Sequence, residues 1–247
     1  MQFIFDNLVA IIVACVLLLG MQVTQIRSQH AGLEQIASHS VKAKTLVFGQ
    51  WVERDIMDIG ANFGTNLYRF EAPTVDDEGN TSEWVFYSDI TQPSGAQARV
   101  FKRYRLVETE LATFRDTTYQ MYQVRRDSAV VTYPAPDVPP TLGSASGKWV
   151  ENTWSIGTLS FFQVDLLDRQ GETPCPTEAE EIKDDDGLVV ACTGDIDVYK
   201  ADYIRVRFGV VPEYVLKPDN YLRELYWVKT LKVRPYWVPP PSLETGA

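Results

Sequence analysis

The first sixty residues constrain the fold of this chain more than any other stretch. An apolar run extends from Phe3 to Val23, and a helix of that length, at about 1.5 Å per residue, matches the ~30 Å hydrocarbon core of a bilayer. Apolar side chains then recur at helical spacing up to Ile59, without a proline. The sequence therefore predicts one long helix over about residues 3–59, in which residues 1–24 span a membrane and residues 25–60 continue it amphipathically. Gly32 and Gly49 are the positions where it could bend or stop.

A cleavable secretory signal is the alternative interpretation of the apolar run. The run has no Lys or Arg ahead of it, is longer than an ordinary signal core and lacks a small-x-small cleavage site followed by a break, which favours a retained span. Small residues at Ala10, Ala14 and Gly20 favour close contact with another helix. Asp6, in the first turn, needs either the headgroup level or a cation as a partner.

From residue 61 the pattern changes to strand-forming residues that alternate between apolar and polar. Turn-rich segments such as Val75–Asn80 separate these runs. Residues 61–235 are therefore expected to form one antiparallel β-rich domain with its own core. Residues 236–247 follow as an extended arm, because the consecutive prolines at 239–241 cannot join a sheet. The predicted fold class is α+β: a long N-terminal transmembrane or spine helix followed by an antiparallel β-sheet domain.

Two of the three cysteines bear on the compartment. Cys175 and Cys192 are too far apart for a CxxC redox motif and have no further Cys or His nearby for a zinc site, so a disulfide is preferred over two free thiols. A disulfide places the domain outside the cytoplasm. Basic side chains that follow the span favour the opposite orientation, but long domains translocate largely regardless of charge. We expect a single-pass inner membrane protein with a periplasmic or extracellular C-terminal domain.

Charge limits the partners of the chain. The net charge is −10 and the sequence pI is about 4.7, so a nucleic acid backbone or an anionic lipid surface is repelled on average. Closely spaced carboxylates on a loop could supply the oxygen ligands of calcium, although they do not match the EF-hand spacing and a hydrated acidic loop explains them too. The residues of this calcium hypothesis are Asp184, Asp186, Asp195 and Asp197.

Catalytic motifs are missing from the sequence. His30 and His39 both lie in the helical stretch, and neither has a second His or a Cys four residues away. Nucleophile elbow, HExxH, Walker and dinucleotide-binding patterns do not occur. We therefore expect no enzyme, no cofactor other than the possible calcium and no small-molecule substrate.

The segments Phe5–Ile11 and Trp51–Gly60 resemble parts of the type IV pilin-like proteins, in particular the minor pilins and minor pseudopilins of pilus and type II secretion systems. The segment Phe5–Ile11 is similar to the pilin N-terminus, in which an acidic residue precedes a Leu-Val-Ala-Ile run, with Asp6 in place of the usual Glu. Trp51–Gly60 is similar to the end of the spine helix in the minor subunits. The late cysteine pair and the antiparallel strands after a long helix also suit that family.

The resemblance implies a structural subunit that packs by its N-terminal helix into a filament. The lipid bilayer and the other subunits are then its partners, and Asp6 pairs with the α-amino group of an adjacent subunit. The alternative is a single-span accessory subunit of a large membrane complex, whose external β domain docks partner subunits.

Overall fold

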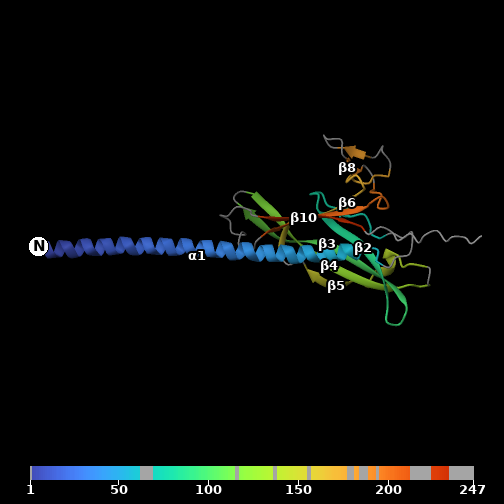
Figure 1. The fold of residues 1–247 in the computed structure, drawn as a ribbon, viewed down its shortest axis with the longest axis horizontal. Coiled ribbons are helices and arrows are strands. Elements are labelled where there is room, and N and C mark those ends of the chain that lie inside the picture. Colours follow the sequence, from blue (N-terminus) through green and yellow to red (C-terminus); the bar gives the residue numbers. More distant parts are fainter. Residues whose placement is uncertain are drawn as a thin grey trace, which may run out of the picture.

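In the computed structural model, the described residues are 2–61, 69–114, 117–135, 138–154, 157–176, 181–183, 189–192, 195–211 and 224–233. A single helix, α1 (Gln2–Met57), opens the chain and has no break at Gly32 or Gly49. It forms a rod whose N-terminal part extends far beyond the β domain (Figure 1). This confirms the predicted long helix.

The end of α1 is joined to the sheet. Gly60 has a φ of 67°, a left-handed conformation that glycine adopts without strain and that commonly ends helices. Its backbone N–H donates to the carbonyl of Tyr87 at 2.9 Å. The chain therefore leaves the helix directly against a strand.

The rest of the domain is built on one eight-stranded antiparallel sheet. Its order is β1-β2-β3-β4-β6-β9-β10, and β5 pairs with a further part of β4. The strands are β1 (Thr74–Val75), β2 (Thr81–Thr91), β3 (Gln97–Phe114), β4 (Thr117–Thr132), β5 (Val150–Trp154), β6 (Thr158–Leu167), β9 (Tyr203–Val211) and β10 (Leu225–Lys232). A 3-10 helix, η1 (Leu142–Ala145), precedes β5, and a separate hairpin joins β7 (Glu181–Lys183) to β8 (Val189–Cys192). The α+β prediction is confirmed.

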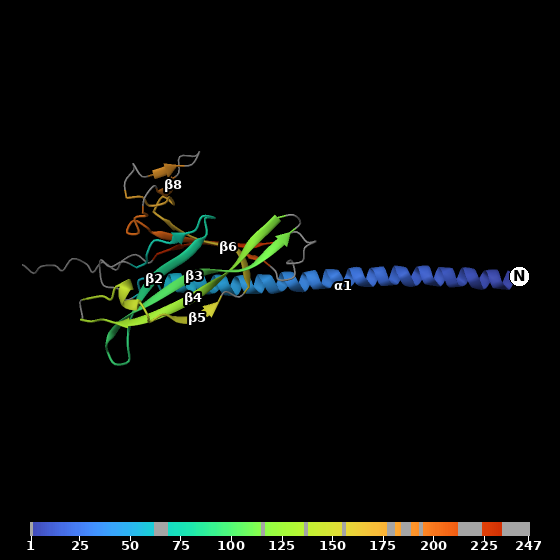
Figure 2. The ribbon, with the colours of Figure 1, turned by 180° about the vertical axis from the view of Figure 1, so that it is seen from behind.

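The main core lies between the C-terminal part of α1 and one face of the sheet (Figure 2). The helix contributes Val41, Phe48, Val52 and Ile56, all at most 7% exposed. Phe48 packs edge-on against Phe208 of β9, with ring centroids 4.7 Å apart. The other large side chains of this core include Phe70, Trp84, Phe86, Tyr104 and Phe162. The helix is therefore a part of the domain core as well as a rod that leaves it.

Gly49 has a packing role instead of a bending one. A Cβ atom built at this position would lie 2.5 Å from Nε1 of Trp227 on β10, so the bare backbone makes room for the indole ring. Around Gly32, by contrast, nothing lies within 4 Å.

A second, smaller cluster covers the opposite face of the sheet. Val85, Tyr87 and Phe101 pack there under Ala145 of η1 and Trp149. The strands β2, β3 and β4 are therefore covered on both faces over part of their length.

Candidate functional site

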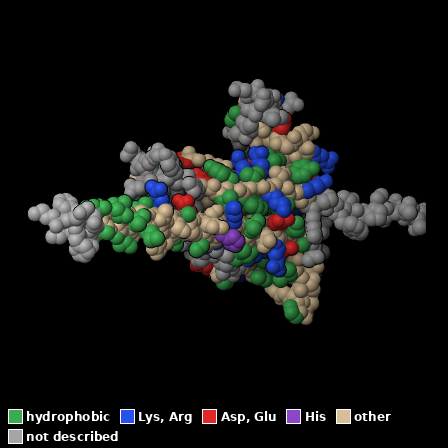
Figure 3. All heavy atoms as spheres, turned by 60° about the vertical axis from the view of Figure 1, so that its left-hand side comes forward, with side chains coloured by type: hydrophobic (Ala, Val, Ile, Leu, Met, Phe, Trp, Pro, Cys, Tyr) green, Lys and Arg blue, Asp and Glu red, His purple; other side chains and the backbone are tan. Residues whose placement is uncertain are grey.

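The exposed part of α1 is the first candidate. α1 is the one helix among the described residues that is long and apolar enough to cross a membrane. Between Val9 and Ser40 its side chains contact little of the domain, and the large apolar ones stay between 48% and 70% exposed. Hydrophobic side chains gather on the outer part of this projecting segment in the space-filling view, and polar side chains and backbone show more towards the domain (Figure 3). Such a surface requires lipid or protein to cover it.

The predicted assembly residues lie on this part of the helix. Ala10 and Ala14 are one turn apart and share a face, whereas Gly20 is rotated by roughly 80° from Ala10 on the side away from Ala14. All three are exposed. The side chain of Asp6 lies outside the described residues, so its cation partner stays a prediction.

The segment between the candidate span and the domain, residues 24–40, carries further exposed apolar side chains. Ile26, Leu33 and Ile36 are 53%, 51% and 69% exposed. At about 100° per residue the three fall within roughly 80° of each other around the helix axis. We call them the stalk stripe. It lies beyond the ~20 residues that a bilayer can cover.

A buried charge cluster fixes the other end of α1. Asp55 is 3% exposed and accepts hydrogen bonds from Nζ of Lys102 at 2.8 Å, Oη of Tyr104 at 2.6 Å and Nη2 of Arg126 at 2.7 Å. Burial, with the charge and the hydrogen bond of Asp55, raises the pKa of the Tyr104 hydroxyl well above its ordinary value. Because Lys102 and Tyr104 belong to β3 and Arg126 to β4, one carboxylate ties the helix to two strands.

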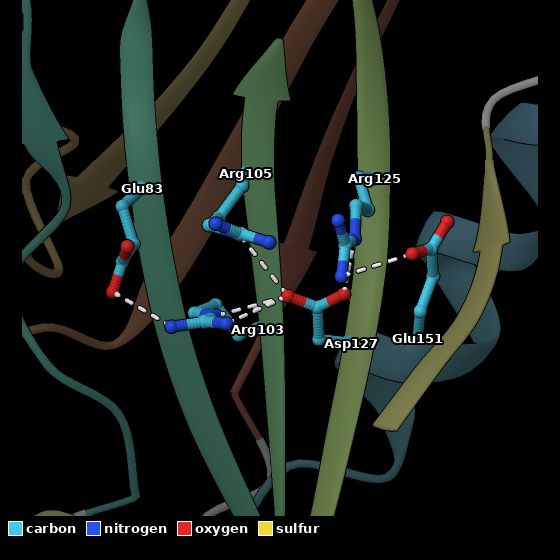
Figure 4. A network of polar contacts seen from close by, with 6 residues as sticks. All are labelled: Glu83, Arg103, Arg105, Arg125, Asp127 and Glu151. Atoms are coloured by element: carbon cyan, nitrogen blue, oxygen red, sulfur yellow. Dashed lines mark hydrogen bonds and ion pairs between the residues drawn. The ribbon is translucent and has the colours of Figure 1, made fainter. Parts of the chain in front are cut away.

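A second cluster lies on the opposite face of the same strands (Figure 4). The side chain of Asp127 is fully buried, and its carboxylate contacts Nη2 of Arg103 at 2.7 Å, Nε of Arg105 at 3.1 Å and Nε of Arg125 at 2.7 Å. Burial opposes ionisation, but the hydrogen bonds from Arg103 and Arg125 and the nearby charges outweigh it and lower the pKa of Asp127. Glu151 adds an ion pair to Arg125 at 3.0 Å.

A shallow hollow of about 390 Å³ adjoins this cluster. Glu83, Arg103, Ser146 and Trp149 contribute to its lining, and the guanidinium of Arg103 lies 4.2 Å from the centroid of the Trp149 ring. Arg103 is therefore held both by a cation–π contact and by Asp127. These contacts serve to fix the strands.

The predicted disulfide is confirmed. Cys175 and Cys192 are bonded, with their Cα atoms 5.6 Å apart. Of the calcium hypothesis, Asp184 and Asp186 lie outside the described residues. Asp195 is exposed, and Asp197 lies 3.7 Å from Nζ of Lys200; among the described residues no three His, Cys, Asp or Glu side chains gather as a metal site. Calcium binding therefore stays a prediction.

Sequence reasoning missed both buried carboxylates. Asp55 lies between the apolar positions Val52 and Ile56 on the stripe that enters the core, and that placement was an available signal of a buried charge. For Asp127 the signal was the group of basic residues on its own strand, β4, and on the adjacent strand, β3. Such a group of cations requires an acidic partner.

In both clusters the carboxylate is already bound by three side chains of the protein itself. The clusters therefore serve to join elements of the fold. The exposed helix remains the surface whose contacts are incomplete. Comparison of the chain with known protein families, with curated proteins and with solved structures finds no match.

Proposed function

We propose that this protein is a non-enzymatic, membrane-anchored assembly subunit, similar to a minor pilin or pseudopilin, which packs by α1 against the helices of neighbouring subunits in a filament. The observation that carries the proposal is the stalk stripe. Apolar side chains are exposed on a continuous helix beyond the length that a bilayer covers.

Lipid accounts for only part of the exposed surface. The run Phe3–Val23 matches the hydrocarbon core, and residues 24–40 then separate it from the first core residue, Val41, by about 26 Å of helix. Each stalk-stripe side chain is at least half exposed, so a neighbouring helix would gain about 1 kcal/mol from each of them. Copies or partners aligned along α1 supply the surface that the stalk lacks.

The other features support the same arrangement. Ala10 and Ala14 allow close approach of another helix. Because α1 continues without a break into the domain core, the packing of α1 against neighbouring helices would also fix the position of the β domain. The disulfide favours an oxidising, extracytoplasmic location for the domain.

The stalk stripe is tested by substituting its residues in the full-length protein. Leu33→Lys and Ile36→Lys place a charge in the proposed contact, whereas Gln35→Lys places the same charge on the opposite side of the helix. We expect the first two to abolish incorporation into the native particle and the third to leave it unchanged. Equal incorporation of all three would refute contact through the stripe.

The type of assembly is decided by negative-stain microscopy of the native particle after gentle extraction. Filaments agree with the proposal, and a compact particle with other subunits identifies the accessory-subunit alternative instead. Asp6→Ala is expected to prevent incorporation while the external domain still folds. A monodisperse monomer in mild detergent, together with wild-type behaviour of Asp6→Ala, would refute both forms of assembly.

The anchor and its orientation are tested separately. The intact mass of the protein from membranes shows whether the apolar run is retained or removed as a signal. Protease added to intact cells or spheroplasts is expected to digest the β domain and to leave a short membrane-protected fragment. Full protection of the domain would place it on the cytoplasmic side.

A further inference from the structure

In the part of the chain that the structure describes, the β10 strand is an edge of the sheet with no strand paired to its outer side. It lies last in the strand order and pairs over all eight residues with β9, without a bulge. In an antiparallel pair, alternate residues direct both their N–H and C=O groups away from the partner strand. Among the described residues, none forms a backbone hydrogen bond to this outer side of β10.

The usual protection of an edge strand is weak here. Natural edges are short, bulged, broken by proline or charged, whereas β10 reads Leu-Tyr-Trp-Val-Lys-Thr-Leu-Lys. Of its two charges, Lys229 is already paired with Glu53 on α1, at 2.5 Å. Of the two lysines, only Lys232, at the end of the strand, is left to disfavour pairing with another strand. A row of unpaired main-chain groups selects an extended peptide as its ligand.

The outward face next to the edge is basic at one end, and at the other it carries apolar side chains beside the carboxylate of Glu224, which accepts a hydrogen bond from Oγ of Ser160 at 2.7 Å. Tyr226 and Val228 are 64% and 58% exposed, and the Tyr226 ring lies 5.6 Å from that of Phe161 on β6. Lys232 lies towards the other end of β10. The two preceding outward positions of β10 pair with Arg207 and Arg205 of β9, and these two arginines share the single carboxylate of Asp165. On a chain with a net charge of −10, this local excess of positive charge favours an acidic strand with apolar residues.

The direction of α1 decides against an antiparallel second copy as the occupant, and the basic end of the edge disfavours a parallel one, in which like charges would lie side by side. Gly49 lies against Trp227, and Glu53 pairs with Lys229, so α1 and β10 advance in the same direction. An antiparallel pair of β10 strands would therefore point the two helices in opposite directions and separate their anchors. This step rests on the membrane anchor of the proposed function. We infer that β10 accepts an extended, acidic segment of a different protein as an added strand.

The test uses the full-length protein in mild detergent and a fluorescein-labelled heptapeptide of alternating Glu and Val. Comparison peptides replace Glu by Lys or carry N-methyl groups on alternate residues. Saturable binding with a Kd below about 1 mM is expected for the acidic peptide. Weaker binding is expected for the Lys peptide, and none for one of the two N-methylation patterns. No saturable binding of the acidic peptide, or equal binding of all peptides, would overturn the inference.

Two adjacent proline variants give the matched control. Of Thr230→Pro and Leu231→Pro, one removes an N–H bonded to β9 and lowers the melting temperature, and the other removes an outward N–H, which an edge strand tolerates. The variant that keeps the wild-type melting temperature is expected to bind the acidic peptide about tenfold more weakly. Wild-type binding by that variant would refute main-chain pairing at β10. Self-association of the wild-type protein that this variant abolishes would identify a second copy as the occupant. Loss of assembly through α1 leaves peptide binding unchanged, so the two proposals fail separately.

Discussion

Replacing Asp55 by alanine tests whether one carboxylate fixes the helix to the sheet. The change leaves the Lys102 ammonium, whose side chain is 11% exposed, without its closest anion, and leaves the Arg126 guanidinium, 28% exposed, without its acceptor. Removing one partner of a buried ion pair costs about 3–5 kcal/mol. For a domain of this size each kcal/mol lowers the melting temperature by about 2–4 °C. We therefore expect a decrease of roughly 6–20 °C.

Asp58→Ala is the matched control. Asp58 also contacts Lys102, at 3.4 Å, but its side chain is 54% exposed, so its loss should cost about 0–1 kcal/mol. Urea unfolding of the full-length protein in mild detergent, followed by tryptophan fluorescence, measures both variants. The double variant Asp55→Ala/Lys102→Met should lose less than the sum of its single changes. If Asp55→Ala costs no more than Asp58→Ala, the cluster does not fix the helix.

Three further predictions concern single positions. Gly49→Ala should destabilise the domain by about 1–3 kcal/mol because its Cβ would meet the rigid Trp227 ring. Gly32→Ala, in open space on the same helix, should be neutral or stabilising by up to about 1 kcal/mol. Equal melting temperatures of the two variants would contradict the packing of Gly49 against Trp227. Because the pKa of Asp127 is lower in the folded state than in the unfolded chain, the ionised carboxylate stabilises the fold at pH values above its unfolded pKa of about 4. This stabilisation is lost as the pH falls further. Unfolding curves between pH 7 and 2 should show that Asp127→Asn weakens this acid dependence. Peptide mass spectrometry without reduction should recover Cys175 linked to Cys192, and alkylation of both of these cysteines in freshly purified protein would contradict the bond.

The elements that depend on local pattern could be predicted from the sequence. The uninterrupted apolar spacing up to Ile59 fixes a long helix, and alternation fixes strands, so the α+β class follows. The pairing of Cys175 with Cys192 follows because they were the two cysteines outside the span. These predictions need only neighbouring residues or a very small set of candidates.

The contacts that join distant elements could not be predicted. Asp55 meets Lys102 and Arg126 only because the helix crosses β3 and β4 at one point, and no sequence spacing encodes that crossing. Gly49 was an expected bend, but the proximity of Trp227, 178 positions later, gives it a packing role. The proposed interface on α1 was suggested by small residues in the candidate span, while the exposure of the stalk stripe became apparent only once the structure showed where burial begins.

The continuity of α1 also determines how the molecule responds to mechanical load. Tension applied between the N-terminal end of α1 and the domain passes along an unbroken helix to Val41 and the core residues after it. Because α1 runs alongside β10, this tension acts parallel to the contact surface, so the helix is loaded in shear. The ion pairs of Glu53 and Asp55 and the aromatic contacts of Phe48 must then yield together. The domain is consequently held most firmly against a pull along the axis of α1.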